Sequence, residues 1–228
     1  MTISKQVNEL PTPHELMKRL IAYVKIDFIK NPKDDDHFFD NHFLRTYHYD
    51  KDWVNNGHFF TIDDSGGDHY YILFSADGCI IKGFDHECEV NPYNYDESFP
   101  VPDCITEHDF YKGVPDELMA LINDPHLKIE KELVTFCVWQ SVDDIEWHFA
   151  PSTIPKNWYD GTDTFLYYSQ NLEQYREWFK DYYLTEIDND ILQSIFDGNL
   201  ITADMIITLN PDVSPAAVLD DLQQMFVI

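Results

Sequence analysis

Residues 69–84 read HYYILFSADGCIIKGF, two β-rich runs on either side of a tight turn. Aromatic and β-branched residues dominate both runs, and Ala76-Asp77-Gly78 between them supplies a glycine for a backbone conformation that most residues avoid. This pattern is typical of an antiparallel β-hairpin. We therefore expect the hairpin to be the centre of the fold and interpret the rest of the chain around it.

Further β-rich runs around the hairpin predict an antiparallel sheet of five to six strands. The predicted strands are His42–Tyr49, His58–Ile62, His69–Ser75, Cys79–Phe84, Leu133–Gln140 and Ile145–Phe149. A helix is expected at Pro13–Ile29, because a Pro and a Glu follow Thr12 at capping positions and Leu16, Leu20, Val24 and Phe28 form one apolar stripe. This stripe is expected to face the core.

The chain after Pro155 has a helical pattern. Predicted helices cover Leu172–Leu184, Asp190–Phe196, a short segment capped by Thr202 and a last segment opened by Ser214-Pro215, and one more lies at Pro115–Ile122. We therefore predict an α+β protein. Residues 1–154 form a sheet domain backed by the N-terminal helix, and residues 155–228 form a helical region that packs on it as one cooperative unit.

Charge is the most unusual property of the composition. The chain carries 42 Asp and Glu against 15 Lys and Arg, a formal charge of −27, and nine acids but no Lys or Arg follow Lys180. A field of this sign repels nucleic acid and anionic membranes and attracts basic proteins. We therefore predict a basic protein partner, no nucleic acid and no membrane.

The expected compartment is the cytoplasm. The longest uncharged apolar run, Leu133–Val142, is half of the about 20 residues that a membrane-spanning helix needs, and residues 1–15 contain no apolar signal region. The four cysteines show no Cys-x-x-Cys spacing, which favours reduced structural thiols. Glycine-rich phosphate loops, dinucleotide fingerprints and common hydrolase motifs are absent from the sequence, so we predict no cofactor.

The open end of the central hairpin holds the best constellation of reactive side chains. A three-residue loop would place His69 opposite Asp85 and Asp68 opposite His86, with Glu87 next in line. His69, Asp85, His86 and Glu87 are therefore the catalytic candidates, and His69, Asp85 and His86 are the candidate metal ligands. The same residues could form a structural network, in which Asp85 caps the amides of residues 87 and 88.

Several short motifs resemble a family of bacterial cytoplasmic proteins with a Gly-Phe-Asp-His-Glu core. The resemblance runs from about Trp53 to Leu222 and rests on Gly67-Asp68-His69, Leu73-Phe74, Gly78, Lys82–Glu87, Pro92-Tyr93, Gly113-Val114-Pro115 and Phe136–Trp139. It implies a bacterial source but no activity. Cys88 stands where the family pattern leads us to expect a small or hydroxyl residue, which argues against an essential polar role there.

The candidate binding residues are acidic and aromatic. Residues 85–124 carry eleven acids and the single cation Lys112. From this region and the loop 155–161 we select Asp96, Glu97, Asp103, Glu107, Asp109, Trp158 and Tyr159.

Three hypotheses follow. The first is an acidic protein-binding module, similar to immunity proteins in charge and architecture class, that neutralises a basic partner such as a toxin. The second is a metal-assisted hydrolase built on the His/Asp constellation, and the third is a scaffold without enzymatic activity.

Overall fold

The computed structural model describes residues 7–32, 45–50, 53, 57–91, 93, 107–150 and 159–226. These residues form an antiparallel sheet of six strands, an N-terminal helix and a series of C-terminal helices, so the α+β class is confirmed. The chain divides into two compact units. Unit 1 contains residues 1–13 and 52–168, and unit 2 contains residues 14–51 and 169–228. Both units are discontinuous in sequence, and the helix that follows Thr12 groups with the C-terminal helices. That residues 1–154 and 155–228 fold as one cooperative unit stays a prediction.

The strands follow one another in the sheet in the order of the sequence. They are β1 (Tyr47–Asp50), β2 (His58–Asp63), β3 (His69–Ser75), β4 (Gly78–Phe84), β5 (Phe136–Ser141) and β6 (His148–Phe149). All six overlap the predicted runs, although β6 is limited to two residues and residues 42–44 of the first run lie outside the described part of the chain.

The register of the β3–β4 hairpin differs from the predicted one by one residue. Ser75 pairs with Gly78, so the loop is the two-residue turn Ala76-Asp77, and His69 pairs with Phe84. Gly78 has a φ of +142°, and a Cβ atom there would lie 2.2 Å from the carbonyl oxygen of Gln140. The glycine therefore allows the backbone of β5 to lie close to β4, and it is a strand residue rather than part of the turn.

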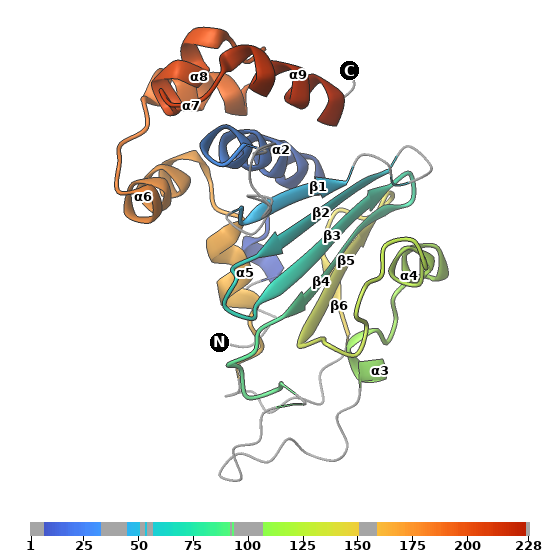
Figure 1. Cartoon of the computed structure of the whole chain (residues 1–228). Coiled ribbons are helices and arrows are strands. Elements are labelled where there is room, and N and C mark those ends of the chain that lie inside the picture. Colours follow the sequence, from blue (N-terminus) through green and yellow to red (C-terminus); the bar gives the residue numbers. More distant parts are fainter. Residues whose placement is uncertain are drawn as a thin grey trace. The chain divides into compact units, whose positions relative to one another are not determined.

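Both faces of the strands in unit 1 are covered, as Figure 1 shows. Helix α4 (Asp116–Ile122) contributes Leu118 and Ile122 to a core with Leu73, Ile80 and Trp139. Helix α5 (Thr162–Tyr168), which the sequence pattern did not predict, places Phe165 against Tyr70 and Phe136. Successive side chains of a strand point to opposite faces of the sheet. Residues on the face covered by α4 therefore do not meet residues on the face covered by α5. Short helices η1 (Val7–Glu9) and α3 (Glu107–Phe110) complete the unit.

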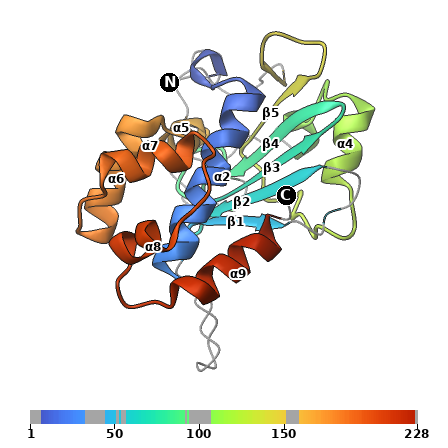
Figure 2. The ribbon, with the colours of Figure 1, turned by 90° about the horizontal axis from the view of Figure 1, so that it is seen from above.

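The described residues of unit 2 form β1 and several helices, and these helices are visible from above in Figure 2. They are α2 (Pro13–Lys30), α6 (Leu172–Tyr183), α7 (Asn189–Phe196), α8 (Ala203–Leu209) and α9 (Pro215–Met225). The predicted helix starts at Thr202 and Ser214 are confirmed, because each side chain accepts a hydrogen bond from the first turn of the helix that follows. Asn171 caps the start of α6 in the same way. The predicted α2 stripe is buried as expected.

Aromatic packing and one buried carboxylate hold unit 2 together. Tyr23 of α2 stacks on Tyr175 of α6 with their ring centroids 4.2 Å apart. Asp27 is fully buried and accepts hydrogen bonds from the backbone N–H groups of Thr46 and Tyr47, at 2.6 and 2.9 Å, and from the Tyr183 hydroxyl. Burial outweighs these hydrogen bonds and raises the pKa of Asp27 to about 6.

Candidate functional site

The open end of the β3–β4 hairpin brings together only part of the predicted constellation. The expected Asp68/His86 pair is present: His86 donates its backbone N–H to Asp68 Oδ1 at 2.8 Å, and its Nδ1 lies 2.8 Å from the same oxygen. This hydrogen bond raises the pKa of His86, while burial raises the pKa of Asp68. Glu87 Oε1 lies 3.9 Å from His86 Nε2, at the edge of the pair.

The predicted His69/Asp85 pair is wrong. Because His69 pairs with Phe84, it shares a face with Lys82, and Asp85 belongs to the opposite face of the sheet. His69 Nε2 lies 3.2 Å from Lys82 Nζ instead. The four catalytic candidates His69, Asp85, His86 and Glu87 therefore do not converge on one site.

Asp85 is the centre of a polar network on the α5 face. Its Oδ1 accepts a hydrogen bond from the Glu87 backbone at 2.9 Å, as predicted for a cap, and its Oδ2 accepts one from Thr164 Oγ1 at 3.0 Å. The Tyr159 hydroxyl shares a short hydrogen bond with Thr164. At Gly161 a Cβ atom would lie 2.4 Å from the Asp85 Cβ, so this glycine allows the start of α5 to pack onto Asp85. The network joins the end of β4 to α5, and its contacts are those of a structural support.

Lys82 lies on the α4 face and is fully buried. Besides His69, its ammonium nitrogen lies 4.9 Å from the ring centre of Tyr71. Burial lowers the pKa of Lys82 to about 7, and burial together with Lys82 lowers the pKa of His69 to about 4. A neutral amine is a nucleophile, but the side chain is closed to solvent, so this pair also belongs to the structure rather than to a reaction centre.

The predicted binding residues fall mostly outside the described part of the chain. Asp96, Glu97, Asp103 and Trp158 lie outside it, as does the side chain of Glu107, while Asp109 is half-buried. Tyr159 is also half-buried, and its backbone N–H donates to Glu89 Oε2 at 2.9 Å. The hydrogen bond between its hydroxyl and Thr164 assigns Tyr159 to the Asp85 network.

Within the described ranges, no group of three or more His, Cys, Asp or Glu side chains is arranged to hold a metal ion. Of the candidate ligands, His69 and Asp85 lie on opposite faces of the sheet, as the register requires. The three described cysteines, Cys79, Cys88 and Cys137, are buried free thiols, and burial raises the pKa of each.

The end of the chain offers a different kind of surface. The stretch 181–226 contains nine acids without a single Lys or Arg, and all but Asp221 are exposed: Asp181, Glu186, Asp188, Asp190, Asp197, Asp204, Asp212 and Asp220. Large apolar side chains are exposed among them, namely Tyr182, Leu184, Leu200 and Ile207. We call these exposed acids and apolar side chains together the C-terminal acidic surface.

Sequence patterns alone missed the apolar members of the C-terminal acidic surface. Helix α6 buries Tyr175, Trp178 and Phe179 and leaves Tyr182 exposed, although all four are aromatic. The lack of cations after Lys180 was the one available signal, and it carried no information on which apolar side chains are exposed.

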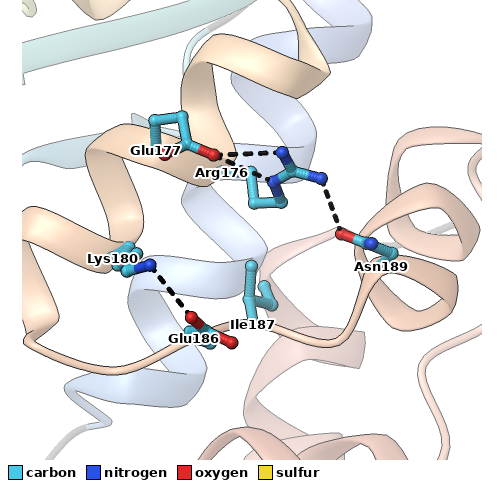
Figure 3. A pocket seen from close by; sticks show the side chains of 6 residues that line it. All are labelled: Arg176, Glu177, Lys180, Glu186, Ile187 and Asn189. Atoms are coloured by element: carbon cyan, nitrogen blue, oxygen red, sulfur yellow. Dashed lines mark hydrogen bonds and ion pairs between the residues drawn. The ribbon is translucent and has the colours of Figure 1, made fainter.

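A hollow of about 250 Å³ lies between α6 and the start of α7, as Figure 3 shows. Arg176, Lys180, Glu186 and Asn189 line it, with Glu177 and Ile187. Arg176 donates to Asn189 Oδ1 at 3.2 Å and to Glu177, and Lys180 donates to Glu186 at 2.9 Å. These polar groups bond one another across the α6–α7 connection.

Comparison with protein-family models, with curated proteins and with solved structures gives no match. None of the helices in the described ranges has the length and apolar character needed to cross a membrane.

Proposed function

We propose that this protein is an acidic binding module that recognises a basic protein through the C-terminal acidic surface. The observation that carries the proposal is the composition of residues 181–226, which contain eight exposed acids, four exposed large apolar side chains and no Lys or Arg. Negatively charged carboxylates attract a cationic partner and raise the rate at which the two proteins associate. Apolar side chains supply the affinity that exposed charges alone do not.

This composition favours a protein partner over other ligands. Nucleic acid and anionic membranes carry the same sign of charge as the surface and are repelled. A small anionic metabolite is repelled for the same reason. A folded basic protein presents both cations and apolar surface, and neutralisation of such a partner is the role that we propose.

The metal-assisted hydrolase hypothesis is not favoured by the geometry. It needs His69 and Asp85 beside His86, and the observed register places His69 next to Lys82 instead. The scaffold hypothesis predicts no preference for basic partners, so the experiment below separates it from the proposal.

The 228-residue chain, immobilised at low salt, should retain one basic protein from the native lysate in stoichiometric amount. Its association rate should then be measured with purified components at increasing ionic strength, and it should fall steeply as salt screens the charges. A partner without excess Lys and Arg, or an association rate that ignores salt, would contradict the proposal.

Charge-matched variants locate the contact. The triple variant Asp204→Asn, Asp212→Asn and Asp220→Asn removes three exposed charges from the C-terminal acidic surface. We expect the association rate to fall roughly threefold to tenfold. The control variant Glu117→Gln, Glu132→Gln and Asp143→Asn removes the same number of exposed charges from unit 1 and should change it much less. Equal effects of the two variants would mean that only net charge matters.

A further inference from the structure

Leu184 combines two unfavourable properties, a strained backbone conformation and an exposed apolar side chain. It follows the last residue of α6 with φ 52° and ψ 32°, the left-handed conformation in which glycine is favoured and a leucine is strained. Its side chain is 89 % exposed, so it gains little from packing within the protein. An observed backbone strain of this kind is a ground for a functional hypothesis, and contact with a partner would bury the exposed side chain.

The turn that carries Leu184 is held in place at both ends. Lys180 and Arg176 of α6 bond Glu186 and Asn189 beyond the turn, as Figure 3 shows. Ile187 is buried within the turn, and the Asp188 side chain caps α7 by accepting from the backbone of Asp190 and Ile191. The contacts that line the hollow therefore hold the backbone of the turn in place. A side chain presented from a fixed backbone loses little conformational entropy when it binds.

Tyr182 provides a second fixed apolar group at the same end of α6. Its ring is 51 % exposed and stacks on Trp178, with ring centroids 4.9 Å apart and an angle of 15° between the planes. Rigid exposed aromatic rings are frequent at the energetic centres of protein interfaces.

The charges around these two side chains specify the kind of partner. Asp181, Glu186 and Asp188 are exposed close to them in sequence. Lys180, which pairs with Glu186, is the last cation of the chain, so no Lys or Arg follows it. Lysine or arginine side chains around an apolar pocket would complement this arrangement.

We propose that Leu184 and Tyr182 each contact the basic partner at the end of α6, and that the partner receives Leu184 in an apolar pocket bordered by Lys and Arg. This inference rests on the proposed function. It adds which side chains supply the affinity and what surface the partner must present.

The decisive variant is Leu184→Gly, because it should improve folding and weaken binding at once. Glycine relieves the left-handed strain, so the unfolding equilibrium constant in urea should fall about twofold to tenfold. The rate at which the captured basic partner dissociates should rise roughly 30-fold, as expected for the loss of a central apolar side chain. Leu184→Asn, which also tolerates this backbone conformation, should show the same loss of binding.

Ser65→Gly is the matched control. Ser65 is exposed, has a φ of 59° and lies in unit 1, so its replacement relieves a similar strain without changing the charge. It should leave the dissociation rate unchanged. If a basic partner is captured but both Leu184 variants release it at the wild-type rate, the inference is overturned while the proposed function stands. If no basic partner is captured, both are overturned.

Discussion

Replacing the buried Lys82 with methionine should remove the rise in stability that this amine causes between pH 7.0 and 8.5. Lys82 is fully buried, and burial lowers its pKa from 10.5 to about 7. In this range the unfolded chain keeps the proton that the folded chain has largely lost. The free energy of unfolding therefore rises with pH, because the unfolded state binds more protons.

The size of the effect follows from the two pKa values. When the unfolded state binds one proton more than the folded state, the free energy of unfolding rises by about 1.4 kcal/mol per pH unit. Allowing for the partial protonation of the folded state near pH 7, Lys82 contributes a rise of about 1.6 kcal/mol from pH 7.0 to 8.5. Three buried thiols act in the opposite direction, because burial raises the pKa of Cys79, Cys88 and Cys137.

The assay is urea unfolding at pH 7.0, 7.5, 8.0 and 8.5 in the presence of a reducing agent. Subtracting the curve of Lys82→Met from that of the wild type cancels the thiols, which both proteins share, and leaves the contribution of Lys82. The same substitution at the exposed Lys112 is the control and should keep the wild-type dependence on pH. If Lys82→Met shows the wild-type rise, the amine is not desolvated as described and the argument fails.

Two further predictions concern other buried sites. Burial raises the pKa of Asp27 to about 6, so the folded chain gains a proton that the unfolded chain does not gain as pH falls from 7 to 5. The free energy of unfolding should therefore rise by about 1.3 kcal/mol between pH 7 and pH 5, and this rise should be absent in Asp27→Asn. Urea unfolding at both pH values measures it, and a rise that persists in the variant would show that Asp27 does not bind the proton. In Gly83→Ala the new Cβ would lie 2.1 Å from the ring of Phe136, so the free energy of unfolding should fall by about 1–3 kcal/mol. An unchanged urea midpoint would show that the ring moves aside freely.

Local chemistry made the elements predictable. The N-cap side chains of Asn171, Thr202 and Ser214 bond amides within three residues, so each signal and its effect lie in the same stretch of sequence. The hairpin strands could be predicted for the same reason, since alternation and the turn are both local. Helix α5, by contrast, depends on the packing of Phe165 against strands far away in the sequence, and the pattern did not indicate it.

The candidate site was only partly predictable because one residue of register decides which side chains meet. The turn residues were found, but Gly78 was interpreted as part of the loop. Its lack of a side chain is required by Gln140, which is 62 positions away on β5. The resulting shift kept Asp68 beside His86 but separated His69 from Asp85.

The sequence by itself determined the α+β class, most of the helix starts and the strongly acidic end of the chain, because each depends on neighbouring residues or on simple counting. The tertiary structure decided the hairpin register, the burial of Lys82 and the exposure of Leu184 and Tyr182. These properties depend on which distant segments pack against a residue, and a strand or helix pattern leaves that choice open because several arrangements bury similar apolar area.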